Sequence, residues 1–227
     1  IYSPPRVTRA ISSMPSLRLV PGFALDLTCI DPDDGQSWDF DIESKQVKAM
    51  DMVRTQKPAM LIGSPMCTAW CTWQALNAVK RPREVVAQEM EKARRHLRFV
   101  ISLYREQMDG GRLFLHEHPE SSSSWHEEMV VELMSSVGVD RVVGDQCKYG
   151  AEVLIGQYLG CPIRKSTGFM SNAPEVLNSL RLRCSGKSGR CSRRLGGERA
   201  TCSGKIAKDA QRYPLDLCKA ILRGIHK

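Results

Sequence analysis

The chain has 227 residues, 42% hydrophobic and 26% charged, which is ordinary for a folded protein and enough to bury a core. No apolar stretch approaches the roughly 20 residues needed to span a bilayer, and no signal peptide opens the chain, so we expect no membrane insertion. Nine cysteines without a compact framework predict free thiols and an intracellular protein, nuclear if its source is a eukaryote. Because the chain begins at Ile1 rather than Met, we expect a piece of a longer polypeptide.

The formal net charge of +8 is concentrated at the carboxyl end. Residues 181–227 hold 13 of the 33 Lys and Arg but 3 of the 25 acidic residues, a net of +10, so the remainder carries −2. Such a block is typical of nucleic-acid binding and equally of solubilising or disordered arms. The candidate nucleic-acid contacts are Arg181, Arg183, Lys187, Arg190, Arg193 and Arg194.

Elements in the first half of the chain follow from apolar spacing and breakers. The Ser- and Pro-rich opening predicts an extended arm over residues 1–20. FALDLTCI predicts a short strand, IESKQVKAMDMVRTQ a helix, and PAMLIG a strand buried on both faces. A helix is expected from near Thr68 through AWCTWQALN, and the stretch from Pro82 to Met108 shows the clearest helical stripe.

The second half continues the alternation. RLFLH predicts a strand, and SSSSWHEEMVVELMSSVG a helix opened by a capping box of Ser124 with Glu127. DRVVGDQC and STGFMSN predict further strands, and a short helix is expected through Leu180. The pattern predicts an α/β domain over residues 21–180, with a Rossmann-like, mainly parallel sheet of five or six strands flanked by helices. A basic Cys/Gly/Arg-rich extension follows over residues 181–227, and its terminal helix is expected to dock through Leu215, Leu217, Ile221 and Leu222.

Two stretches that carry chemistry follow predicted strands, where ligands bind in such sheets. In GSPMC, a thiol of Cys67 at the amino end of a helix would have a lowered pKa and act as a nucleophile, or else it is a small buried hydrophobe. In FLHEHP, Glu117 between two histidines would serve as a proton donor if burial raised its carboxyl pKa. A solvated strand end and a His116–His118 metal pair are the alternatives.

Two further groups of residues also have alternative interpretations. Arg164 and Lys165 in GCPIRKS would hold a phosphate or a base edge, or else form a solvated strand start. Cys184, Cys191 and Cys202 lie in a Gly- and Arg-rich stretch, but their spacing is not that of a zinc ribbon or knuckle. We therefore expect no metal site.

In order, GSPMC, HEHP, GCPIRKS and the earlier WDFD resemble the catalytic half of a cytosine-5 DNA methyltransferase. Over nearly its whole length the chain also resembles a methyltransferase-like segment of Ty1/copia-like retrotransposon polyproteins of the dinoflagellate type. That match rests on the stretches YSPPRVT, GFALDL, WDFD, GSPMCTAW, GRLFLHEHPESSSSW, DQCKYG, STGFMSN and QRYPLDLCKAI.

The resemblance implies a role for each matching residue. Catalysis is implied for Cys67, Glu117 and Arg164, and substrate binding for Ser64, Pro65, His118 and Lys165. Asp26 and Asp39 are implied to contact S-adenosylmethionine, although the family's Phe-x-Gly-x-Gly cofactor loop is missing and Met66 replaces its second proline. The implied partner is DNA. The sequence leaves two functions open: a transferase that modifies a flipped cytosine, and a catalytically silent nucleic-acid-binding module of a polyprotein.

Overall fold

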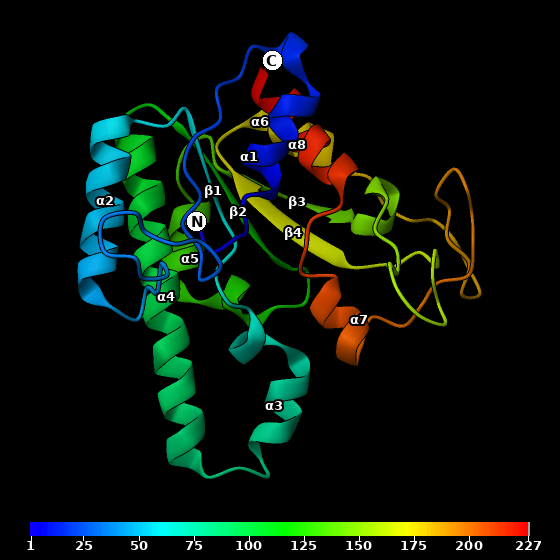
Figure 1. Ribbon diagram of the computed structural model, residues 1–227. Coiled ribbons are helices and arrows are strands. Elements are labelled where there is room, and N and C mark those ends of the chain that lie inside the picture. Colours follow the sequence, from blue (N-terminus) through cyan, green and yellow to red (C-terminus); the bar gives the residue numbers. More distant parts are fainter. Residues whose placement is uncertain (227) are drawn as a thin grey trace. The chain divides into compact units, whose positions relative to one another are not determined.

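The computed structural model describes residues 1–226 and shows an α/β fold with one four-stranded sheet in the order β1-β2-β4-β3 (Figure 1). The strands are β1 Met60–Gly63, β2 Leu113–Pro119, β3 Asp140–Asp145 and β4 Ser166–Ser171. The helices are α1 Arg6–Ala10, α2 Glu43–Gln56, α3 Thr72–Ala78, α4 Arg83–Asp109, α5 Glu128–Met134, α6 Pro174–Leu180, α7 Gly204–Asp209 and α8 Leu215–His226. Five short 3-10 helices join them: η1 Ile11–Ser13, η2 Pro15–Leu17, η3 Thr68–Trp70, η4 Ser123–His126 and η5 Gln146–Tyr149.

The sheet is mixed, which corrects the prediction of a mainly parallel sheet with five or six strands. β1 and β2 are parallel, with Met60 opposite Leu113 and Gly63 opposite His116. β3 and β4 instead run in opposite directions. The amide of Gln146, just after β3, donates to the carbonyl of Lys165, just before β4, at 3.0 Å. No α-helix lies between β3 and β4 in the described chain, and a parallel connection usually needs one. A Rossmann-like fold therefore stays a prediction.

The described chain divides into two compact units. Unit 1 contains residues 1–4, 22–140 and 170–173, and unit 2 contains residues 5–21, 141–169 and 174–227. Both are discontinuous along the sequence, and the boundaries predicted at residues 20 and 180 stay predictions. Among the described residues, no helix is both long and apolar enough to cross a membrane.

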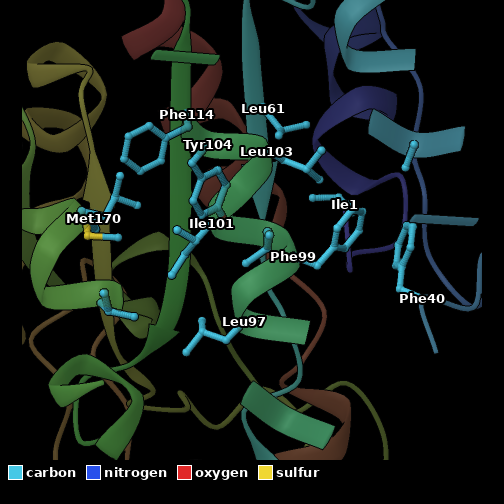
Figure 2. Close-up of a cluster of buried hydrophobic side chains, with 14 of the residues drawn as sticks. Ile1, Phe40, Leu61, Leu97, Phe99, Ile101, Leu103, Tyr104, Phe114 and Met170 are labelled. Carbon is cyan, nitrogen blue, oxygen red and sulfur yellow. The ribbon is translucent and has the colours of Figure 1, made fainter. Parts of the chain in front are cut away.

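The core of unit 1 forms around α4 (Figure 2). Leu97, Val100 and Leu103 are buried on the apolar stripe that the sequence predicted. The Tyr104 ring stacks on Phe114 of β2, with centroids 4.6 Å apart. Gly63 allows this close packing, since a Cβ atom there would lie 2.1 Å from the Tyr104 hydroxyl and 2.8 Å from a Val100 methyl. β1, α4 and β2 therefore form one rigid support for the loops that follow the two strands.

The core of unit 2 is the packing of α8 on α6 and α1 (Figure 1). Leu217, Ile221 and Leu222 are buried, as predicted, whereas Leu215 is 48% exposed. Arg6 of α1 fixes the start of α8 by donating two hydrogen bonds to the Tyr213 carbonyl, at 2.8 and 3.0 Å. The predicted terminal helix and its docking are confirmed for three of the four leucine and isoleucine positions.

Several local predictions are wrong. Residues 6–17 form α1, η1 and η2 rather than an extended arm. FALDLTCI contains no strand, since the Asp26 carboxylate accepts from the amide and hydroxyl of Thr28 and turns the chain. The predicted capping box is absent: Glu127 itself precedes α5, and the Ser124 hydroxyl bonds His118 instead.

Candidate functional site

The loop that carries Cys67 starts where β1 ends. Because Gly63 lies opposite His116 in the parallel pair, the residues after Gly63 run alongside the last residues of β2. His118 Nε2 lies 2.9 Å from the carbonyl oxygen of Pro65, and both residues are buried. The structure thus brings together the two predicted motifs, GSPMC and HEHP, within unit 1.

A chain of hydrogen bonds fixes the tautomer of His118. The Pro65 carbonyl can only accept, so Nε2 carries the proton and donates to it. Nδ1 lies 2.6 Å from the Ser124 hydroxyl, which lies 2.8 Å from the Ser122 hydroxyl. His118 therefore holds the Pro65 backbone in place, two residues before Cys67, through a fully buried polar chain.

Glu117 and the two histidines lie on opposite faces of β2, because side chains alternate along a strand. His116 and His118 pack against Trp125, with ring centroids 5.3 and 6.2 Å away, and His116 Nδ1 lies 3.1 Å from the Tyr104 hydroxyl. Glu117 is only 5% exposed. The imidazoles are thus part of the core around α4, and the buried carboxyl group is the chemically distinct group of the motif.

The helix expected to begin at Thr68 is broken in two. Cys67 precedes η3, a single 3-10 turn, and α3 starts only at Thr72 because Cys71 has extended backbone angles. A turn of three residues carries little of the dipole that would lower a thiol pKa. The proposed activation of Cys67 by a helix therefore loses its basis, and its thiol is half-buried in the loop.

The two carboxylates expected to contact a cofactor close local turns. Asp26 accepts from Thr28, and Asp39 accepts from the Asp41 amide at 2.9 Å. Of the WDFD motif, it is Asp41 that contacts basic side chains: Lys92 at 2.5 Å and His96 at 3.1 Å, with His96 also bonded to the Tyr2 hydroxyl. Burial lowers the pKa of His96. The sequence missed this cluster, since His96 appears only as one position in a long helix.

A second buried network missed by the sequence fixes the start of α2. The fully buried Asp31 carboxylate pairs with Lys45 at 2.6 Å and Lys48 at 2.5 Å. Burial alone would raise its pKa, but hydrogen bonds from the two lysines lower it to about 2. Both ammonium groups also lie over the Trp38 ring, 5.0 and 5.4 Å from its centroid. The network ties the segment before α2 to the helix itself.

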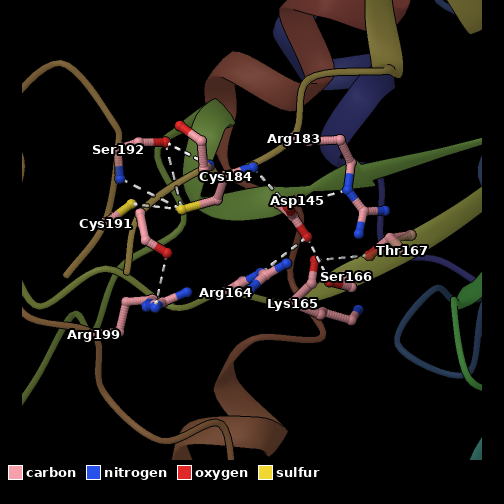
Figure 3. A network of polar contacts seen from close by, with 12 residues as sticks. Asp145, Arg164, Lys165, Ser166, Thr167, Arg183, Cys184, Cys191, Ser192 and Arg199 are labelled. Atoms are coloured by element: carbon pink, nitrogen blue, oxygen red, sulfur yellow. Dashed lines mark hydrogen bonds and ion pairs between the residues drawn. The ribbon is translucent and has the colours of Figure 1, made fainter. Parts of the chain in front are cut away.

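Arg164 and Lys165 belong to unit 2, in the segment before β4. Arg164 Nε lies 3.4 Å from the buried Asp145 carboxylate, which also accepts from Ser166 and from the Cys184 amide (Figure 3). Burial raises the pKa of Asp145, but these hydrogen bonds together with Arg183 and Arg164 lower it overall. The predicted convergence of Arg164 with Cys67 and Glu117 stays a prediction.

The basic residues after α6 fall into two groups. Arg181, Arg183, Lys187, Arg190 and Arg194 are exposed. Arg193 is instead held by Glu152 at 2.7 Å and by the carbonyls of Gly160 and Gly196. The stretch is loop-rich as predicted, but Arg193 is part of its internal structure rather than a free cation.

Three buried cysteines of unit 2 cluster together. Cys147, Cys184 and Cys191 have their sulfur atoms within 4.8 Å of one another, whereas Cys202 is exposed. Burial raises the pKa of Cys147. Burial also opposes ionisation of Cys184, but N–H and O–H groups of Ser192 and the Gly186 amide donate to its sulfur and lower its pKa to about 6. The sequence missed Cys147, which lies far earlier in the chain.

A cavity of about 320 Å³ in unit 1 lies beside Cys71. Its wall includes Trp70, Cys71, Arg81, Glu89 and Ser123. The sequence gives no signal for this cavity, since nothing in the spacing of Cys71 distinguishes a residue that lines one.

No family model, curated protein or solved structure matches the chain. The resemblance to cytosine-5 methyltransferases therefore continues to rest on the motifs of the sequence itself.

Proposed function

We propose that unit 1 carries a methyltransferase-like site that adds the Cys67 thiolate to a cytosine flipped out of a nucleic acid, preferably DNA. The observation that carries the proposal is the hydrogen bond from His118 to the Pro65 carbonyl. It holds the loop bearing Cys67 against the strand that bears the buried Glu117. The addition needs a thiol and a carboxyl group, and the residues that offer them lie at the ends of two adjacent parallel strands.

The addition uses only Cys67, Glu117 and the cytosine, and its protons and electron pairs are accounted for as follows. The thiolate forms a bond to carbon 6, the electrons of the carbon 5–carbon 6 double bond move towards N3, and Glu117 donates its proton to N3. Carbon 5 thereby becomes nucleophilic and exchanges its hydrogen with water. Reversal returns the proton to Glu117 and releases the thiolate.

S-adenosylmethionine is the methyl donor that the resemblance implies, but the described residues do not fit it. Asp26 and Asp39 both have a carboxylate oxygen engaged in a local turn, and the glycine loop is missing from the sequence. The proposal therefore covers the addition to cytosine and derives no methyl transfer.

The test measures release of tritium from DNA labelled at carbon 5 of cytosine. We expect release by the wild-type chain, loss with Cys67→Ser or Glu117→Gln, and retention with Cys71→Ser as the matched thiol control. A parallel incubation of 5-fluorocytosine DNA with S-adenosylmethionine reports methyl transfer through a denaturation-resistant adduct. Release that survives Cys67→Ser, or no release by a folded wild-type chain, contradicts the proposal.

A second function is favoured by the exposed side chains of Lys187, Arg190 and Arg194: a module that holds nucleic acid by its backbone. Binding should weaken steeply with salt and show little sequence preference. The triple change of these residues to Gln should reduce the salt slope by up to about 2.7, at about 0.9 per phosphate contact. The matched control changes Arg54, Lys57 and Lys80, which are also exposed, to Gln. Equal slopes for both triples, measured by fluorescence anisotropy, exclude this surface.

A further inference from the structure

The strongest unassigned group in the molecule is the thiol cluster of unit 2. Cys147 lies on η5, and Cys184 and Cys191 lie seven residues apart in the loop after α6. Their exposed fractions are 0%, 5% and 7%, and they form a buried cluster of their own, apart from the other apolar side chains. The three thiols come from two distant segments and meet away from solvent. Such a group is typical of metal ligands rather than of ordinary apolar packing.

The spacing of the sulfur atoms fits a shared metal ion. Sγ of Cys184 and Sγ of Cys191 are 3.7 Å apart (Figure 3). A disulfide would require about 2.05 Å. Two thiolates on one tetrahedral zinc ion, each about 2.3 Å from the metal, would be separated by about 3.8 Å. The third sulfur, that of Cys147, lies within the same 4.8 Å limit.

Hydrogen-bond donors point at the sulfur atoms, as in the outer shell of thiolate sites. The Ser192 amide and hydroxyl donate to Sγ of Cys184 at 3.4 and 3.6 Å. The Arg193 amide donates to Sγ of Cys191 at 3.4 Å. A neutral thiol needs no such set of donors, whereas a thiolate that binds a metal gains from each of them.

The loop between Cys184 and Cys191 is fixed in the conformation that brings its ends together. Arg199 donates to the carbonyls of Gly189 and Gly186, at 3.3 and 3.4 Å, and Lys148 donates to the Ser192 carbonyl at 2.7 Å. Gly186 has no room for a side chain, since a Cβ atom would lie 2.1 Å from the Arg190 carbonyl. Lys148 and Arg199 also place positive charge near a site that would carry a net charge of −1 with three thiolates.

We propose that unit 2 binds one zinc ion through the thiolates of Cys147, Cys184 and Cys191, with a water molecule or another exogenous ligand as the fourth donor. The ion links the loop after α6 to η5 and so has a structural role. Each thiol loses its proton to solvent when the metal binds, and no oxidation or reduction is involved.

The test is metal analysis of the whole chain, purified under reducing conditions and then dialysed against zinc. We expect one zinc ion per chain, and a loss of at least tenfold in zinc affinity with Cys184→Ser or Cys191→Ser. Cys202→Ser is the matched control, because Cys202 lies in the same stretch but is exposed, and it should bind zinc like the wild type.

Cobalt titration of the wild-type chain tests the proposal without any variant that might fail to fold. Tetrahedral thiolate coordination gives strong visible absorption together with a sulfur-to-cobalt charge-transfer band. Absence of both bands in the folded chain, or zinc binding that survives Cys147→Ser and Cys184→Ser together, overturns the proposal. A Cys184–Cys191 disulfide found by mass spectrometry in the freshly reduced and zinc-dialysed chain overturns it as well.

Discussion

The two units bury polar groups in different ways. In unit 1, Ser122, Ser124 and His118 form a neutral chain that ends on the Pro65 carbonyl, beside an apolar core built on α4. In unit 2, the residues around Asp145 and the cysteine cluster are joined by charges and by bonds from side chains to backbone. Unit 1 also buries charge in the Asp31–Lys45 pair, so the contrast concerns the loop that bears Cys67 in unit 1 and the segment that bears Cys184 in unit 2.

This difference suggests how each unit is stabilised. Unit 1 has a long helix whose apolar stripe covers two parallel strands, so its loops are supported by packing. The main apolar packing of unit 2 is that of the helix pair α6 and α8 together with α1, while residues 181–203 contain no helix or regular strand. We expect unit 2 to depend on that helix pair and on the contacts of Asp145 far more than on the length of its regular elements.

The largest effect is expected from Leu217→Ala in α8. Leu217 is fully buried, and truncating such a leucine costs about 2–5 kcal/mol in the free energy of unfolding. Denaturant unfolding followed by circular dichroism measures the change. The control is Leu215→Ala in the same helix, where the half-exposed side chain should cost much less. Similar losses for both variants would mean that α8 does not form the core of unit 2.

Asp145→Asn should destabilise unit 2 by about 1–3 kcal/mol, the range for leaving buried polar partners unsatisfied. The carboxylate is buried, accepts from the Cys184 amide at 2.7 Å, and balances Arg164 and Arg183. Amide hydrogen exchange at Cys184 reports the local loss, with the exposed Asp140→Asn as control. Unchanged protection of that amide would show that the charge network is not what orders the segment.

Ser124→Ala makes the corresponding change in unit 1, again with an expected cost of about 1–3 kcal/mol. It removes the hydroxyl bonded to His118 Nδ1 and so takes away one of the two contacts that orient the ring. Tritium release should fall with it, because the Pro65 carbonyl is then less well held. Ser135→Ala removes an exposed hydroxyl bonded only locally to Val131 and should leave both stability and activity unchanged. If Ser124→Ala changes neither the free energy of unfolding nor tritium release, the polar chain does not hold the loop that bears Cys67.

The contrast between the units also decides what the sequence could predict. α2, α4, α6, α8 and strands β1, β2 and β4 follow from apolar periodicity, which depends on neighbours in the sequence. The strand expected at FALDLTCI failed because one carboxylate, that of Asp26, bonds its own backbone. The reversed direction of β4 depends on the irregular segment after β3, which has no periodic signal.

The candidate site also has features that the sequence predicted and features that it did not. Strand ends predicted that the GSPMC and HEHP motifs lie together, because parallel neighbours share an edge, and the contact between Pro65 and His118 confirms this for the motifs. The role of His118 was not predictable, since its partners Ser124 and Pro65 are known only from the register of β1 and β2. Cys147 was missed for a similar reason: its partners Cys184 and Cys191 belong to a different part of the sequence.

The smallest expected effect concerns pH and unit 1. Burial lowers the pKa of His96, so the unfolded chain binds a proton more readily than the folded one. The free energy of unfolding should therefore fall as the pH drops below about 6.5, the ordinary histidine value, and the loss should level off below the folded pKa. Asp41, 3.1 Å from Nε2, partly offsets the shift. His96→Gln should make the free energy of unfolding depend less on pH. Urea unfolding between about pH 5 and about pH 8 measures this dependence. His126→Gln, at an exposed histidine, should leave it unchanged. If both variants retain the wild-type slope, the buried His96–Asp41 contact does not contribute to the pH dependence of the free energy of unfolding.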